Sequence, residues 1–189
     1  MRRMLTRMAF AVMTFMALTA CGSRLDDPGA PASADEIAQA EAHMRALPSV
    51  HDSEAQLAAV IRQVADAVET AAPALEWQTT ANRALGTLGC PSPYLETDGV
   101  SMTTDTLRSP TPINDDEWPS VITIARDTAA QHGMTSLTVR ADSPGRHDVV
   151  LSSPHNGDKI TIITHGAAVI TGVTGCRFRA EDLQNPASK

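Results

Sequence analysis

The chain has 189 residues, of which 42% are hydrophobic and only 3% aromatic, so it has room for one domain with an aliphatic core of rather small side chains. Its formal net charge is −7, from 15 basic and 22 acidic residues. Such an acidic protein is not expected to bind nucleic acid or an anionic lipid surface through broad electrostatic attraction.

Residues 1–20 form a predicted signal peptide. Three arginines within the first seven residues precede an apolar run from Met8 to Ala20. This run is too short to cross a hydrocarbon layer as a helix, which needs about 20 residues. It fits the apolar part of a bacterial secretory signal, whose positive end stays in the cytoplasm. Because the leader holds three arginines and no acid, its removal would take the formal charge from −7 to about −10.

The end of this run has the pattern of a lipobox. Leu18 is aliphatic, Thr19 and Ala20 are small, and Cys21 offers the thiol that accepts a diacylglyceryl group. Cleavage before Cys21 would free an amine for a further acyl chain such as palmitate, and two or three chains give a stable anchor. The alternative is a chance cysteine after an ordinary signal peptide. The pattern predicts a lipoprotein held at the extracytoplasmic face of the cell membrane through lipid on Cys21.

The mature chain divides into a tether and one folded domain. Residues 21–34 start at the lipidated cysteine and continue with Gly, Pro, Ser and Ala without periodicity, which is typical of a flexible tether. Residues 35–189 are expected to form a single extracytoplasmic domain.

The first half of this domain is expected to begin with two helices. Ser33 and Glu36 have capping-box spacing, which predicts a helix over 34–47 that ends before Pro48. A second helix, capped by Asp52 or Ser53, is expected to reach Ala72. Its apolar residues fall on one stripe of period 3.6, which favours a core-facing helix. These stripe residues are Leu57, Val60, Ile61, Val64 and Val68.

The rest of the domain is mainly strand-like. Strands are expected at 75–79 and at 100–104, the second polar and at a sheet edge, with a loop over 80–95 between them. A third helix is expected over 116–132, capped by the acidic pair Asp115 and Asp116. Four further strands are expected at 136–141, 147–152, 159–165 and 168–174, with a tight turn at Asn156–Gly157. The order α-α-β-β-α-β-β-β-β predicts an α+β fold, a mainly antiparallel sheet with helices packed on one face.

Two cysteines remain besides Cys21. Cys90 and Cys176 lie far apart in the sequence, and an exported domain meets oxidising conditions, which favours one disulfide between them. A zinc pair is disfavoured, because neither cysteine has another Cys or a His at ligand spacing. A catalytic thiol paired in space with a histidine stays open as an alternative.

A family resemblance follows from the order of these features. The lipobox is followed by a long amphipathic helix, Trp77, a Gly-Cys pair at 89–90, a helix ended by Gly133 and a second Gly-Cys pair at 175–176. In this the chain resembles the mycobacterial lipoproteins of the LppA/LppV type. The resemblance implies a lipid-anchored envelope protein, strengthens the disulfide interpretation, and brings no catalytic residues.

Histidines give the only hint of a metal or acid/base site. None of the six forms an HxH or HExxH pair, and all are expected at the solvated surface. The sharper hypothesis places His147 and His165 on neighbouring strands, with Asp148 and Asp158 on the same hairpin, as a weak metal or acid/base site. Nucleophile-elbow, P-loop and GxGxxG motifs are absent from the sequence, so we expect neither an enzyme nor a cofactor.

Trp77 and Trp118 are expected to anchor the core where helices meet the sheet, and the alternative is a pair that lines a ligand site. The favoured function is a non-catalytic module that binds an envelope protein or a wall component, an interpretation that relies partly on the polar strand at 100–104. The second hypothesis is a carrier for a small apolar ligand or lipid, in a cavity lined by residues such as Trp77, Ile122 and Ile162. A hydrolase with a nonstandard site ranks last.

Overall fold

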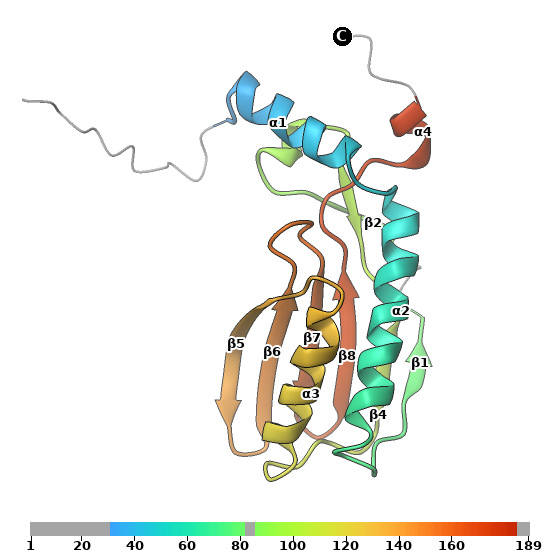
Figure 1. Ribbon diagram of the computed structural model, residues 1–189, viewed down its shortest axis with the longest axis vertical. Helices are drawn as coiled ribbons and strands as arrows, with labels where there is room; N and C mark the ends of the chain where they lie inside the picture. Colours follow the sequence, from blue (N-terminus) through green and yellow to red (C-terminus); the bar gives the residue numbers. More distant parts are fainter. Residues whose placement is uncertain (1–30, 82–85, 185–189) are drawn as a thin grey trace, which may run out of the picture. The chain divides into compact units, whose positions relative to one another are not determined.

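The structure is a computed structural model that describes residues 31–81 and 86–184. In it, α2 and α3 pack on one face of a six-stranded antiparallel sheet (Figure 1), so the expected α+β class is confirmed. No described helix combines the length and apolarity needed to cross a membrane. The elements in chain order are α1 (Ala34–Arg45), α2 (Val50–Val68), β1 (Gln78–Thr80), β2 (Thr87–Gly89), the 3-10 turn η2 (Tyr94–Glu96), β3 (Val100–Met102), β4 (Thr106–Ser109), α3 (Trp118–Ala130), β5 (Ser136–Ser143), β6 (Arg146–Ser152), β7 (Lys159–Thr164), β8 (Ala168–Val173) and α4 (Ala180–Gln184).

The caps of the first two helices were only partly foreseen. Ser33 caps α1 in a full capping box, in which Glu36 accepts a hydrogen bond from the Ser33 backbone at 2.8 Å. The cap of α2 is Ser49 and not Asp52 or Ser53, because the Ser49 hydroxyl accepts the Asp52 N–H at 3.3 Å. The cap of α2 therefore lies three residues before Asp52, and the helix starts at Val50.

The apolar stripe of α2 packs directly on the sheet, as its spacing predicted. Each stripe residue is at most 8% exposed. Contact with β8 is closest at Gly172, where an added Cβ would lie 2.7 Å from Ile61 Cδ1 and 2.9 Å from Leu57 Cδ2. Glycine is thus needed at this position so that the helix can approach the strand.

The six-stranded sheet has the order β1-β4-β8-β7-β6-β5, and all its pairs are antiparallel. Alternation along β7 and β8 turns Ile160, Ile162 and Ile170 inward, where all three are fully buried. At one edge, β5 has a bulge between Val139 and Ala141. Arg140 lies at this bulge and binds Asp148 at 3.1 Å and the Thr161 hydroxyl at 3.1 Å.

The structure adds two strands that were not expected and corrects a third. Strand β4 lies inside the sheet between β1 and β8, and β2 pairs with β3 in a separate two-stranded sheet. The expectation of an exposed polar edge at 100–104 is wrong. Ser101 and Met102 are buried. Thr104 is fully buried as well, and its hydroxyl is satisfied there because it accepts the Gly172 N–H at 3.0 Å. This segment therefore does not supply the exposed surface that favoured an interaction module.

Candidate functional site

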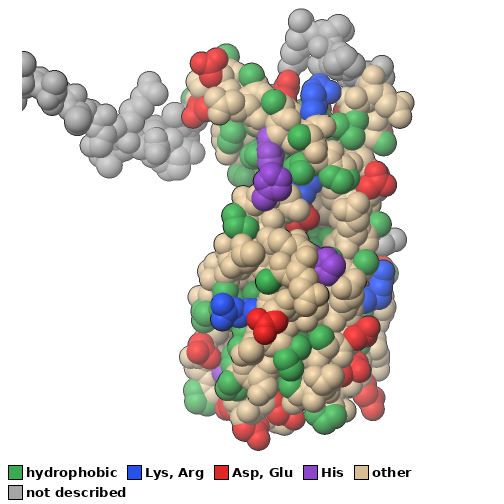
Figure 2. All heavy atoms as spheres, viewed as in Figure 1, with side chains coloured by type: hydrophobic (Ala, Val, Ile, Leu, Met, Phe, Trp, Pro, Cys, Tyr) green, Lys and Arg blue, Asp and Glu red, His purple; other side chains and the backbone are tan. Residues whose placement is uncertain are grey.

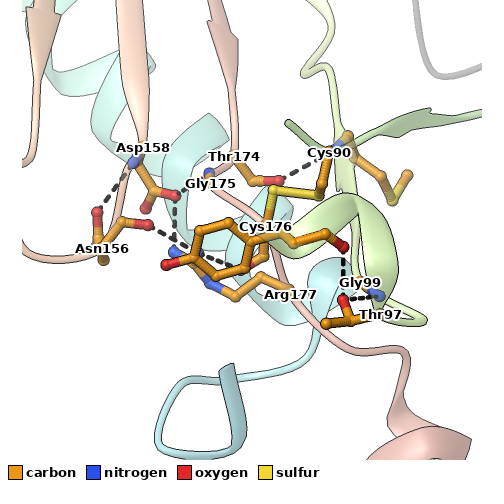
Figure 3. Close-up of a disulfide and its surroundings, with 11 residues drawn as sticks. Cys90, Thr97, Gly99, Asn156, Asp158, Thr174, Gly175, Cys176 and Arg177 are labelled. Carbon is orange, nitrogen blue, oxygen red and sulfur yellow. Dashed lines mark hydrogen bonds and ion pairs between the residues drawn. A yellow bond between two sulfur atoms is a disulfide. The ribbon is translucent and has the colours of Figure 1, made fainter. Parts of the chain in front are cut away.

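A disulfide joins Cys90 to Cys176, with 6.0 Å between the two Cα atoms (Figure 3). Cys90 follows β2 directly, and Cys176 lies three residues after β8. Backbone hydrogen bonds support the same junction, because Val100 and Arg177 exchange both their N–H···O bonds at 2.9 and 2.8 Å. The thiols are therefore bonded to each other, and neither acts as a nucleophile in this state.

Arg177 forms the polar centre of this end of the domain. The Arg177 residue is only 1% exposed, and each of its three guanidinium nitrogens has a hydrogen-bond partner within the protein. Nη2 donates to Asp158 at 2.8 Å, Nε donates to the Ser53 hydroxyl at 3.1 Å, and Nη1 donates to the backbone carbonyls of Asn156 and Cys176. The buried charge is thus paired with a carboxylate and held by four hydrogen bonds.

Burial dominates the electrostatics of this ion pair. It raises the pKa of Asp158 above the usual carboxyl value, although the Gly175 N–H and Arg177 act in the opposite direction. Burial also lowers the pKa of Arg177, and attraction to Asp158 opposes that shift. The pair holds the β6–β7 loop against the end of β8, which Figure 3 shows through Asp158, Asn156, Gly175 and Arg177.

Gly175 allows the loop and the strand end to meet. A Cβ at this position would collide with the Asn156 carbonyl and would lie 2.7 Å from Arg177 Nη1. The Gly175 N–H instead donates to Asp158 Oδ1 at 2.8 Å. On the loop, Gly157 adopts φ +78°, which favours glycine. These contacts fix the β6–β7 loop as one wall of a hollow.

That hollow is the strongest candidate for a binding site. It has a volume of about 310 Å³, in the range of small-molecule sites. We call it the histidine pocket, because α1 contributes His43 and the β6–β7 loop contributes His155, with ring centroids 5.9 Å apart. Tyr94 of η2 approaches His43 at 6.5 Å between ring centroids. Histidine side chains gather on the matching part of the surface in Figure 2, near α1. The remaining lining residues are Pro91, Ser101, Pro154, Asn156, Gly157, Lys159, Val173, Thr174, Gly175 and Cys176.

The histidine pocket differs in charge from three other hollows of the described surface. Those three are lined in part by Asp127, Asp158 and Asp115, respectively. The lining of the histidine pocket contains Lys159 and two histidines but no carboxylate. In a chain of net charge −7, this is a local reversal of sign.

A second polar cluster surrounds His147 at the other end of β6. His147 is only 6% exposed, so the expected surface position is wrong for this residue. Its Nδ1 lies 2.7 Å from Asp142 and its Nε2 lies 2.9 Å from Asp115. The ring is thus held between two carboxylates. It stacks on Trp118 at 4.6 Å between ring centroids with an interplanar angle of 11°.

Asp115 has a different role from the expected helix cap. Helix α3 starts after Glu117, which makes no side-chain capping bond. Asp115 instead accepts the Gly145 N–H at 2.8 Å, and this bond, followed by that from His147, lowers the pKa of its carboxyl. The cluster therefore ties the loop before α3 to the β5–β6 hairpin.

The structure does not assemble the metal or acid/base site proposed around His147 and His165. His147 pairs with Thr164 in the sheet, and His165 lies beyond β7, where its Nδ1 faces the Gly145 carbonyl at 3.4 Å. Asp148 pairs with Arg140 near one end of the hairpin, and Asp158 pairs with Arg177 at the other. Across residues 31–81 and 86–184, no group of three or more His, Cys, Asp or Glu is placed to hold a metal ion.

The tryptophans pack against the core. Trp118 is 7% exposed and belongs to the central cluster, and Trp77 packs against that cluster from outside. The buried Trp77 indole nitrogen has no hydrogen-bond partner among the described residues. Of the residues suggested for an apolar cavity, Ile162 is fully buried in the same cluster and Ile122 packs against it. These side chains thus fill the space between helices and sheet.

The lipobox residues Leu18, Thr19, Ala20 and Cys21 lie outside the described residues. Sequence reasoning missed the histidine pocket, because its rings and its lysine come from four separate segments. The turn at Asn156–Gly157 was the one local signal near it, and it marked a hairpin rather than a site.

Comparison with known proteins identifies the family of this chain. The model of the LppA family, described as a lipoprotein confined to pathogenic Mycobacterium, matches residues 25–180. The chain belongs to the LppA family. The resemblance found in its sequence is thereby confirmed. This LppA-family chain is accordingly a member of a family of lipoproteins, which implies association with the cell envelope.

One solved structure agrees with this assignment at the level of the fold, and a second is reported beside it. The crystal structure of the lipoprotein LppA from Mycobacterium tuberculosis aligns with a TM-score of 0.67 and 18% identity, covering 82% of this LppA-family chain and 92% of the other. A DUF4853 family protein from Actinomyces odontolyticus aligns with a TM-score of 0.44 and 13% identity, covering 75% and 76% of the two chains. A search of curated proteins gives no match.

Proposed function

We propose that this LppA-family chain is a non-catalytic binding module, anchored by lipid on Cys21 to the extracytoplasmic face of the cell membrane, that holds its ligand in the histidine pocket. The observation that carries the proposal is the local reversal of charge in a concave site built from α1, η2 and the β6–β7 loop. The lipobox in the sequence and the lipoprotein family support the anchor.

The construction of the pocket supports binding better than catalysis. Among the described residues, no hydrogen bond joins a hydroxyl to His43 or His155, so the arrangement lacks a base poised on a nucleophile. Cys176 is committed to the disulfide. One wall is held by the Arg177–Asp158 pair, which gives the pocket a fixed shape and keeps low the cost of ordering it when a ligand binds.

Native mass spectrometry of the full chain, gently extracted from its own membrane, tests the proposal. We expect a mass increase from acyl chains at Cys21 and an additional noncovalent mass. The Tyr94→Ala/His155→Ala variant should lose the noncovalent mass and keep the acyl chains. His165→Ala is the matched control, because His165 lies at the opposite end of β7 and should leave the bound mass unchanged.

Two results would contradict the proposal. If the wild-type protein carries no noncovalent mass, it does not hold a ligand in its own membrane. If the mass persists in the Tyr94→Ala/His155→Ala variant, the ligand binds elsewhere. An unmodified Cys21 would contradict the anchor alone.

A further inference from the structure

We infer that the ligand of the histidine pocket is a short saccharide that carries a carboxylate. The inference rests on the proposed function and names the chemistry of the ligand that the pocket would take. Three features of the pocket lead to it: its flat walls, its surplus of hydrogen-bond donors and its single lysine.

The walls of the pocket offer flat ring faces rather than a narrow aliphatic channel. Tyr94, His43 and His155 contribute rings from three different elements, and Pro91 and Pro154 add two rigid ring faces. The C–H face of a sugar ring packs well against such surfaces, while its hydroxyls reach polar groups at the rim. The modest volume of about 310 Å³ suits a short saccharide or the end of a chain.

The polar groups of the pocket are biased toward donation. The Asn156 side-chain oxygen already accepts the Asp158 N–H at 3.0 Å, which leaves its NH₂ group to donate. The Thr174 hydroxyl oxygen accepts the Met102 N–H at 3.0 Å, so its hydrogen remains to donate from a side chain that is only 3% exposed. Lys159 is exposed and forms no ion pair with the described residues. A ligand rich in oxygen acceptors and negative charge satisfies all three.

The charge of the pocket suits a carboxylate better than a phosphate. Phosphate is favoured by bidentate arginines or by helix N-termini. The guanidinium of Arg177 makes four hydrogen bonds inside the protein, to Asp158, Ser53 and two carbonyls. Helix α1 presents its C-terminal turn here, through His43, and this end of a helix dipole is partly negative. One lysine with two imidazoles therefore matches a single carboxylate charge.

The test is a titration of the full chain in detergent micelles, followed by calorimetry and by the NMR signals of the histidine rings. The probes are glucuronic acid, N-acetylmuramic acid and trigalacturonic acid, with α-1,4-linked galactotriose as the uncharged match for the last. Comparison of the monosaccharides with the trisaccharide distinguishes a free acidic sugar from the end of a polymer. We expect at least one acidic probe to bind and to shift the His43 and His155 signals, and galactotriose to bind about tenfold more weakly than trigalacturonic acid or not at all.

Variants assign the binding to the pocket. Lys159→Gln should weaken the binding of the acidic probe by about tenfold, because the substitution removes one charged hydrogen bond. Arg146→Gln removes an exposed cation at the other end of β6 and should leave the affinity for the acidic probe unchanged. Tyr94→Ala should weaken binding, whereas Tyr94→Phe keeps the ring and should bind nearly as well as the wild type.

Three outcomes would overturn the inference. They are equal binding of galactotriose and trigalacturonic acid, unchanged affinity in Lys159→Gln, and no binding of any acidic probe at millimolar concentration. In each case a noncovalent mass that still depends on Tyr94 and His155 would leave the binding module in place with a ligand of another class.

Discussion

Arg177 is a single residue that connects α2, the β6–β7 loop and the end of β8. Its charge is buried beside Asp158 and meets four hydrogen-bond acceptors, so its loss affects α2, the β6–β7 loop and the segment after β8 at once. This role could not be predicted from the sequence, because a lone arginine after a cysteine forms no recognisable motif. Only the fold brings Ser53 and Asp158 to it, across 124 and 19 residues of sequence.

We expect Arg177→Met to lower the free energy of unfolding by about 3–5 kcal/mol, because it leaves the Asp158 carboxylate buried without its partner. Urea unfolding of the two proteins measures the difference. The double variant Arg177→Met/Asp158→Leu should recover part of the loss, since it removes both charges. Arg146→Met, at an exposed position, should change the free energy by no more than about 0.5 kcal/mol. An equal loss in the single and double variants would show that the unpaired charge is not the cause.

The Asp115 carboxylate predicts a dependence of stability on pH. The Gly145 N–H and His147 lower its pKa in the folded protein below the ordinary value of 3.8. A group with a depressed folded pKa stabilises the protein above its unfolded pKa, and this contribution is lost as the pH falls through the folded pKa. We therefore expect Asp115→Asn to be less stable than the wild type near neutral pH, and the gap to close as the pH falls below about 3.8.

Denaturant unfolding at a series of pH values measures this gap. Asp116→Asn is the matched control, because the neighbouring carboxylate has neither of the two partners of Asp115. A gap that stays constant down to low pH would mean that the carboxylate charge of Asp115 does not contribute in the way its contacts suggest.

At the scale of elements, the sequence was informative wherever periodicity ran for six residues or more. The stripe from Leu57 to Val68 located α2, and alternation located β5 to β8 within about two residues at each end. The short strands β2 and β4 were missed, because three or four residues are too few for a pattern. The polarity of Ser101 and Thr104 suggested an exposed segment, whereas both are buried and the Thr104 hydroxyl accepts the Gly172 N–H.

The same reasoning explains why the candidate site was not predicted. The residues of the histidine pocket come from α1, η2, the β6–β7 loop and the end of β8, so no local window contains two of the three rings of His43, Tyr94 and His155. The disulfide was foreseen because it depended only on the compartment and on the number of cysteines. Burial of His147 was not, since two carboxylates that lie distant from each other in the sequence surround it only in the fold.

At the scale of the whole molecule, the disulfide closes a long stretch of a domain that has one continuous aliphatic core. Cys90 and Cys176 are 86 positions apart. On the chain-entropy account, opening a loop of this length lowers the free energy of unfolding by about 4–5 kcal/mol. We expect the Cys90→Ser/Cys176→Ser variant to show this loss in urea unfolding.

A reductant provides the internal control for this prediction. Reduction should destabilise the wild type to the level of the double variant and should leave the double variant itself unchanged. If reduction leaves the wild type as stable as before, the core and its hydrogen bonds hold the two segments together without the covalent link.

The bulge at Arg140 affects how two copies of the domain can meet. An open sheet invites another strand to add at its rim, and this is a common start of aggregation. In the part of the chain that the structure describes, one rim of the six-stranded sheet is β1, which has only three residues. The other is β5, which is eight residues long but is interrupted where the side chain of Arg140 is tied to Asp148 and Thr161. Neither edge therefore favours the pairing of its strand with the sheet edge of another copy.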